Sequence, residues 1–255
     1  MRKTFLIFIY TFSICFLFGQ SDDQEIWTTW YLKPLHGKTK QLEKGIIDHV
    51  KKHHGQGGWP EYYFEILSGP NQGSFAGWSG PHTWKAFDER VRSQADVRHW
   101  NQYVAPYADM SNDKGTSFLI MHKDLKYGPD SAPEYYHLSW NMTYPGTGGQ
   151  YKKIARTSKQ VKESTDSKNY HTIYQVVSGN NPDAWLWEYP INSMEELGMS
   201  TGASGASDIK KVLGEEGAKE FWELYRNTVR SRVREIHKLR SDMSTPVDTS
   251  KTEEN

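Results

Sequence analysis

The sequence predicts an α+β protein in which two tandem βαββαβ repeats pack sheet to sheet as a pseudo-twofold α/β barrel, after an N-terminal signal peptide. Three observations predict this fold. A strand-and-turn segment at 64–71 recurs at 174–181, the two halves contain strands and helices in the same order, and matching residues keep a nearly constant separation. Self-similarity of this kind indicates that one supersecondary unit occurs twice in the chain.

The recurring segment reads FEILSGPN at 64–71 and YQVVSGNN at 174–181. In both copies an aromatic and aliphatic strand runs into a Ser-Gly turn that ends in Asn, which is a typical strand-and-turn pattern. Ser68 and Ser178 are 110 positions apart, whereas Trp78 and Trp187 are 109 apart. The order and the nearly constant spacing of these matches favour an internal duplication.

The N-terminus has the pattern of a targeting segment. Arg2 and Lys3 precede an apolar run over 5–18, which has the length of a signal-peptide core, and we place cleavage near Gly19. A lipoprotein attached at Cys15 and an uncleaved anchor are the alternatives. Signal peptide 1–19 therefore predicts an exported protein, periplasmic or extracellular, with no transmembrane segment after cleavage.

Cysteine and charge content narrow the chemistry. Cys15 is the single cysteine, so the mature chain has no disulfide, cysteine nucleophile or zinc-thiolate site. Lys plus Arg and Asp plus Glu both number 31, and this zero net charge argues against a nucleic-acid partner or an anionic membrane surface. Aromatic residues make up 14% of the chain, which is enough for a large core and an aromatic ligand site.

The first repeat is assigned to 26–125. Leu42, Ile46 and Val50 recur at helical spacing after the first strand, and Gly55 ends that helix. The predicted elements are strands at 26–32, 62–67, 74–78 and 118–122 and helices at 39–54 and 83–105.

A proline- and glycine-containing linker over 126–133 separates the two repeats. The second repeat is assigned to 134–240, and a polar, disordered tail follows over 241–255. The predicted elements of the second repeat are strands at 136–143, 172–177, 184–189 and 229–239 and helices at 150–162 and 209–226.

A βαββαβ unit leaves one face of its sheet uncovered, so two units in one chain can cover each other. The element order resembles the dimeric α/β-barrel (ferredoxin-like) superfamily in a fused, single-chain form, over Ile26 to Leu239. This resemblance implies a monomer with an internal pseudo-dimer. It also implies a function among cofactor-free monooxygenases, haem enzymes and small-molecule binding proteins, without assigning any functional residue.

Two groups of residues are candidates for catalysis. Glu65 and its counterpart Gln175 are expected to point into the barrel, where a carboxylate would have a raised pKa and could act as a base. His122 and His237 are expected at matching places on the fourth strands, facing one cavity, as bases or as an axial haem ligand. The alternative for each residue is a solvent-exposed position.

Ligand binding is assigned to an aromatic cage with polar groups inside it. The residues assigned to this site are Trp30, Glu65, Trp78, Trp140, Gln175 and Trp187. Core packing of these tryptophans is the alternative.

His49 and His53 are four residues apart on the predicted helix 39–54, a spacing that metal ligands also use. The sequence shows no third ligand for them, and Lys51 and Lys52 lie between them. Basic residues at a helix C-terminus interact favourably with the helix dipole, which is the interpretation preferred here. The sequence therefore predicts no metal site and no cofactor.

The first functional hypothesis is an exported protein that binds a small apolar or aromatic ligand in its barrel. The first alternative is an enzyme of the same fold, either a cofactor-independent monooxygenase or a haem protein. The second alternative is an envelope module that binds a protein partner.

Overall fold

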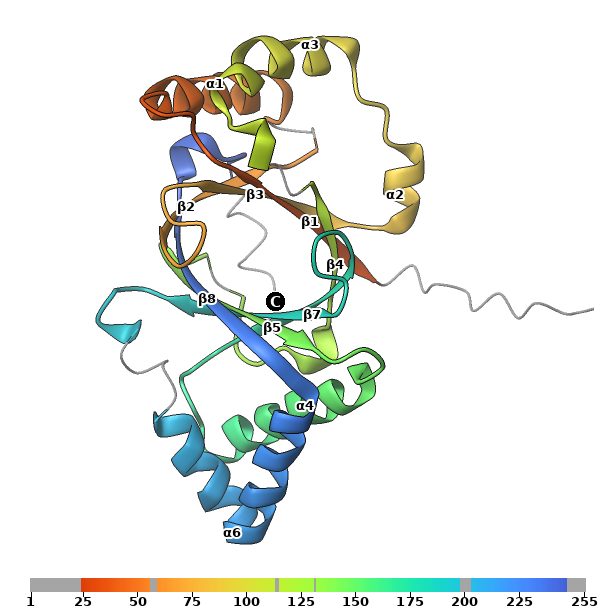
Figure 1. The fold of residues 1–255 in the computed structure, drawn as a ribbon, viewed down its shortest axis with the longest axis vertical. Coiled ribbons are helices and arrows are strands. Elements are labelled where there is room, and N and C mark those ends of the chain that lie inside the picture. Colours follow the sequence, from red (N-terminus) through yellow and green to blue (C-terminus); the bar gives the residue numbers. More distant parts are fainter. Residues whose placement is uncertain (1–23, 56–58, 113–114, 131, 198–202, 247–255) are drawn as a thin grey trace, which may run out of the picture.

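The computed structural model describes residues 24–246, apart from 56–58, 113–114, 131 and 198–202. The predicted signal peptide and the tail beyond residue 246 lie outside the described residues. Figure 1 shows a barrel of strands in the middle of the molecule, with helices on two opposite sides. None of the helices within this part of the chain has the length and apolar character needed to cross a membrane.

The strands and helices alternate in the predicted order. The strands are β1 (Glu25–Leu32), β2 (Tyr62–Ser68), β3 (Phe75–His82), β4 (Ser117–Met121), β5 (Tyr135–Thr143), β6 (Thr172–Ser178), β7 (Ala184–Ile191) and β8 (Val229–Leu239). The main helices are α1 (Thr39–His53), α2 (Trp84–Glu89), α3 (Gln94–Tyr103), α4 (Gly148–Ser164) and α6 (Ala203–Thr228). The hydroxyls of Thr83 and Ser93 cap α2 and α3 by accepting hydrogen bonds from backbone N–H groups.

The strands form one closed antiparallel barrel in the order β1-β3-β2-β8-β5-β7-β6-β4. Strand β2 pairs with β8, and β4 pairs with β6, so the two sets of four strands join edge to edge. The predicted packing of two ferredoxin-like repeats sheet to sheet is therefore wrong. Closure pairs the backbone N–H and C=O groups that two face-packed sheets would leave unpaired at their edges.

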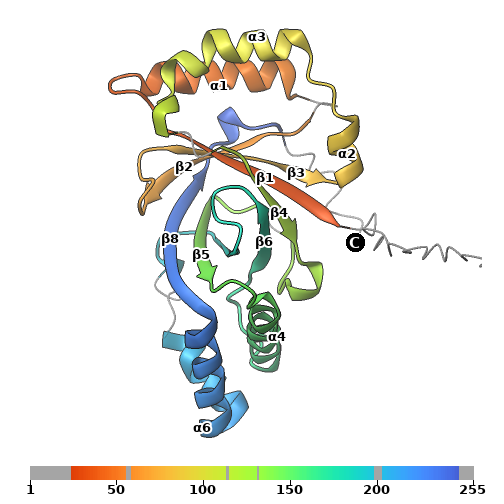
Figure 2. The same cartoon turned by 45° about the vertical axis from the view of Figure 1, so that its right-hand side comes forward.

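Side chains alternate between the inside and the outside of the barrel. An inner cluster includes Ile66, Trp78, Leu138 and Leu186. On one outer side α1 and α3 cover a second cluster, and on the opposite side α4 and α6 cover a third, as Figure 2 shows from another angle. The chain buries aromatic side chains on both faces of its sheet, because the inner face is enclosed by the barrel and the outer face is covered by helices.

The chain stays ordered beyond the predicted start of the tail at residue 241. Met243 is fully buried, the Ser244 hydroxyl accepts a hydrogen bond from the Tyr63 backbone N–H, and the Thr245 hydroxyl accepts one from the Glu61 N–H. Residues 241–246 therefore pack against the start of β2, next to one end of the barrel.

Gly45 fixes how closely α1 approaches α3. A Cβ atom at Gly45 would lie 2.0 Å from the backbone oxygen of Tyr103. We expect Gly45→Ala to lower the free energy of unfolding by about 1–3 kcal/mol, because the helices must separate to accommodate the methyl group. Urea unfolding measures this loss.

The matched control is Gly149→Ala in α4, where a Cβ would meet no atom within 4 Å. Alanine there is expected to leave stability unchanged or slightly higher, because its helix propensity exceeds that of glycine. Equal stabilities of the two variants would show that the α1–α3 contact is not tight.

Candidate functional site

A cavity of about 510 Å³ lies at one end of the barrel. It is lined by inward-facing aromatic side chains from five strands: Trp27, Tyr62, Phe64, Trp78, Tyr136 and Tyr174. The Trp27 ring meets the rings of Trp78 and Tyr174 edge-on, with centroids 6.4 and 6.3 Å apart. Ligand pockets are typically about 300–1,000 Å³ and mostly apolar, so this cavity has the size and the character of a small-molecule site.

Glu188 provides a carboxylate in the wall of this cavity. It lies on β7, and its side chain makes no hydrogen bond to the part of the chain that the structure describes. Burial raises the pKa of Glu188 to about 7, although the charge of nearby Lys126 opposes the increase. A carboxylate that is half ionised near neutral pH and has no partner can accept a proton from a bound molecule.

The strand pairing explains why sequence reasoning missed Glu188. Tyr62 pairs with Trp78, and Thr172, which is 110 positions after Tyr62, pairs with Glu188. Glu188 therefore occupies the place of Trp78 in the other half of the barrel. The comparison of the two halves of the sequence matched Trp78 to Trp187, one residue before Glu188. A shift of one residue moves a side chain to the opposite face of a strand. A constant separation of 110 through both hairpins would have found Glu188.

The predicted inward orientation of Glu65 and Gln175 is wrong. On β2 the side chains of Phe64 and Ile66 pack into the barrel, so Glu65 lies on the outer face, where it comes within 4.0 Å of Arg240. Gln175 is also on the outer face, with its Oε1 3.2 Å from Nε2 of His122. Neither residue borders the cavity.

His122 and His237 do not meet. His122 follows β4 and stacks on Trp185 beneath α4, with ring centroids 5.2 Å apart. His237 lies inside the barrel, and its Nε2 donates to Glu235 Oε2 across 3.0 Å. The two histidines had been matched at a separation of 115 positions. In the structure His237 pairs with Ile66, whereas Leu119 pairs with Val176, the equivalent of Ile66 in the other half. Leu119 is therefore the counterpart of His237.

The four tryptophans do not form one cage. Trp78 lines the large cavity, whereas Trp140 borders a smaller cavity of about 160 Å³ at the other end of the barrel. Trp30 and Trp187 lie outside the barrel under the two helical layers. Of the six residues assigned to ligand binding, Trp78 alone lines the large cavity.

A buried polar network lies between the two ends of the barrel. Glu235 and His237 are each 1% exposed. Asn71 Nδ2 donates to Glu235 Oε1 across 2.7 Å, and the Tyr31 hydroxyl donates to Oε2 across 3.2 Å. Burial by itself raises the pKa of Glu235. The hydrogen bonds to its carboxylate, with the contribution of His237 the largest among them, have the greater combined effect, so the pKa of Glu235 is lowered. The network gives the barrel a charged centre on the side of β8.

Histidine is one of the side chains that can ligate a haem iron axially, and it is the ligand that the sequence analysis considered. His171 borders the large cavity, but its Nε2 lies 3.0 Å from the Leu125 carbonyl and its Nδ1 2.8 Å from Lys162 Nζ. His237 does not border that cavity, and His137 borders a space of about 170 Å³ under α4 and α6, below the usual range for drug-sized ligands. Among the described residues, no histidine with a ring nitrogen free of other contacts borders the large cavity, so the histidine-ligated haem considered from the sequence does not fit there.

No protein-family model matches the sequence, and no curated protein matches it. Solved structures are similar to the fold, among them the following three. A "putative monooxygenase" from Fusobacterium nucleatum has a TM-score of 0.55 at 11% identity, covering 85% of this chain and 92% of its own. An anthrone oxidase-like protein has a TM-score of 0.56 at 8% identity, covering 86% and 92%. A mutant chlorite dismutase from Candidatus Nitrospira defluvii has a TM-score of 0.50 at 7% identity, covering 87% and 93%.

Such neighbours belong to the dimeric α/β barrel superfamily, which agrees with the resemblance inferred from the element order. At these identities the likeness concerns the fold alone. Function must be argued from the cavity.

Proposed function

We propose that this protein binds a small aromatic molecule in the barrel cavity, with Glu188 accepting a hydrogen bond from it. The observation that carries the proposal is a carboxylate without a hydrogen-bond partner, among the described residues, facing an aromatic cavity of about 510 Å³. Aromatic rings that meet edge-on offer both faces and edges for stacking a planar ligand. The ligand class is therefore a planar ring with an O–H or N–H group.

Proton transfer is the second candidate function, and the pKa of Glu188 favours it. A general base works best when its pKa lies near the working pH, and that of Glu188 is about 7. Glu188 would take a proton from an acidic O–H or C–H bond of the ligand and leave the electron pair on the ligand. In a cofactor-independent monooxygenase this anion would then react with O2. The fold is consistent with this enzyme alternative, since one neighbour is called a "putative monooxygenase".

Export completes the proposal, and the support for it is the sequence of residues 1–19. The full-length protein produced in bacterial cells is expected to lose this segment and to accumulate outside the cytoplasm. Cell fractionation with N-terminal sequencing measures both. A cytoplasmic protein that retains Met1 would contradict export without affecting the cavity.

Ligand binding can be tested with a panel of phenols, naphthols and indoles in a thermal-shift assay, followed by calorimetry. A ligand at 100 times its Kd stabilises the folded state by about 2.7 kcal/mol, which raises the melting temperature measurably. We expect Thr172→Trp to weaken binding at least ~10-fold. Thr172 lines the cavity next to Glu188, its partner on the neighbouring strand, and an indole there would occupy the ligand's space.

Thr116→Trp, at an exposed position, is the matched control and is expected to bind normally. If no panel member binds, and protein purified from cells carries no small molecule in a native mass spectrum, the binding proposal is wrong. The envelope-module alternative is then favoured.

A further inference from the structure

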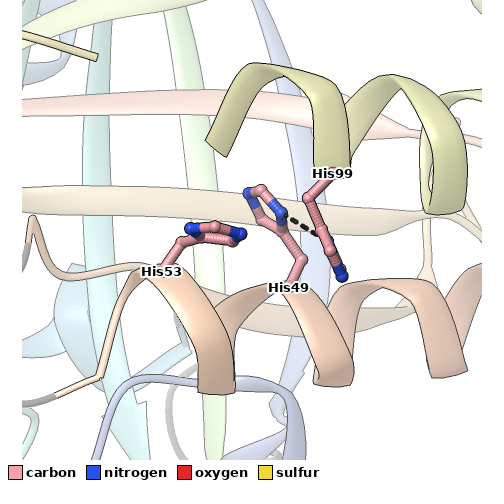
Figure 3. Close-up of side chains that lie close together, drawn as sticks. All are labelled: His49, His53 and His99. Atoms are coloured by element: carbon pink, nitrogen blue, oxygen red, sulfur yellow. Dashed lines mark hydrogen bonds between the residues drawn. The ribbon is translucent and has the colours of Figure 1, made fainter. Parts of the chain in front are cut away.

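A cluster of imidazole and carboxylate groups lies where α1 meets α3, on the outside of the barrel. Figure 3 shows His49 and His53 projecting from α1 towards His99 of α3. His54, directly after α1, and Asp96, in the first turn of α3, belong to the same cluster. The histidines at 49, 53 and 54 precede Asp96 and His99 by more than 40 positions in the sequence, and the close approach of the two helices at Gly45 brings the two groups together.

Three buried atoms in this cluster have the spacing of metal ligands. His49 Nε2 lies 3.2 Å from His54 Nε2 and 3.3 Å from Asp96 Oδ1, and His54 Nε2 lies 3.9 Å from Asp96 Oδ1. A tetrahedral zinc ion with bonds of ~2.0–2.1 Å separates its ligand atoms by about 3.3–3.4 Å. The three atoms therefore need to move only slightly to surround one ion.

Each of these three side chains is also held by a second group. His54 Nδ1 donates to the Trp59 carbonyl across 2.8 Å, which leaves the lone pair of its Nε2 free to bind. His49 Nδ1 lies 3.2 Å from His99 Nδ1, and Asp96 Oδ2 accepts from Arg92 Nε across 3.4 Å. Metal-binding histidines and carboxylates are usually oriented by outer partners of this kind.

Charge and hydrogen bonding point the same way. Asp96 Oδ1 is buried and has no hydrogen-bond partner among the residues that the structure describes, although the other oxygen of the same carboxylate is bonded. A divalent cation bound between the three side chains would give Asp96 Oδ1 a charged partner. Glu61 Oε1, 3.5 Å from His54 Nε2, adds a second carboxylate beside the cluster.

An ion can reach the cluster from solvent. A cavity of about 480 Å³ opens beside it and is lined by His54, Asp96, Trp59 and Arg90, among others. The Arg90 guanidinium stacks over the Trp59 ring at 4.3 Å, at one wall of this opening. His54 and Asp96 therefore face both His49 and an entry path.

We propose that His49, His54 and Asp96 bind a divalent transition-metal ion of the zinc type, through two imidazoles and one carboxylate. The fourth position of the ion faces the entry cavity and Glu61. The ion ties α1 to α3, and none of its three ligands lines the barrel cavity, so the proposal does not rest on the function proposed there. The sequence interpretation of no metal site rested on the helical pair His49 and His53 with no third ligand apparent. In the structure His54 at the end of α1 and Asp96 of α3 supply the further ligands.

The test uses full-length protein prepared with a histidine-free tag and treated with a chelator. Calorimetry with Zn2+ and native mass spectrometry measure affinity and stoichiometry, and the visible spectrum with Co2+ reports the coordination geometry. We expect one Zn2+ per chain, a higher melting temperature with Zn2+, and a tetrahedral Co2+ spectrum. His54→Gln and Asp96→Asn are expected to weaken Zn2+ binding at least ~100-fold, since losing even an outer partner costs 10–100-fold.

Two controls keep the proposal falsifiable. His36→Gln changes an exposed histidine elsewhere and is expected to bind Zn2+ as the wild type does. His53→Gln is expected to retain binding, because His53 belongs to a second group with His49 and His99. Loss of binding in His53→Gln but not in His54→Gln would overturn the assignment, and so would an unchanged affinity in Asp96→Asn. Absence of Zn2+ binding by folded wild-type protein would overturn the proposal altogether.

Discussion

Replacing Glu188 with glutamine is expected to make the protein more stable by about 2–3 kcal/mol at pH 8 and to leave its stability nearly unchanged at pH 4. Burial raises the pKa of Glu188 from 4.5 to about 7, so between these values the folded state binds more protons than the unfolded state. Stability therefore falls as the pH rises through this range. Each pKa step of one corresponds to ~1.4 kcal/mol, and glutamine removes the cost of the buried charge.

Chemical unfolding of both proteins at several pH values between 4 and 8 measures the effect. Glu65→Gln is the matched control, because Glu65 lies on the outer face of the barrel, and its change is expected to stay within ~0.5 kcal/mol. If Glu188 acts on a ligand, the glutamine variant also loses proton transfer by about 10²–10⁴-fold. A stability difference that does not grow with pH would show that Glu188 is not the buried acid described here.

Glu235→Ala is expected to lower the free energy of unfolding by about 3–5 kcal/mol. Its carboxylate accepts hydrogen bonds from the buried His237 and from the partly buried Asn71 and Tyr31, and removing it takes away the acceptor of all three bonds. Glu235→Gln keeps part of this hydrogen bonding and is expected to lose about 1–3 kcal/mol. Denaturant unfolding at pH 7 gives both values.

Arg230→Ala, at an exposed position of β8, serves as the control and is expected to change stability by less than ~0.5 kcal/mol. The pKa of Glu235 is lowered, so its stabilising effect is present above the unfolded pKa and is lost as the pH falls through the folded value. A Glu235→Ala variant as stable as the control would mean that water replaces the carboxylate at little cost.

Local sequence patterns predicted most elements with good boundaries. The predicted last strand, 229–239, is the observed β8, and the predicted helix at 39–54 matches α1 within one residue. Apolar periodicity and turn residues act over a few positions, so they are visible in one sequence. The internal duplication and export stay predictions.

The residues of the candidate site are brought together by contacts between distant parts of the chain, and the sequence did not predict which side chains face the cavity. Matching Trp78 to Trp187 was an error of one residue, and it hid Glu188 in the cavity wall. Glu65 was matched to Gln175 in the correct register, but it was assigned to the wrong face of its strand. Neighbouring strand residues point to opposite faces, so a small error in register inverts the assignment.

The sequence by itself determined the order of strands and helices, the aromatic content of the core and the recurrence of one strand-and-turn segment. The tertiary structure alone decided that the eight strands close into one barrel, that Glu188 faces its cavity, and that His49, His54 and Asp96 meet. The physical reason is that local patterns are set by neighbouring residues. Strand closure, side-chain facing and helix contact depend on pairings between segments that are distant in the chain.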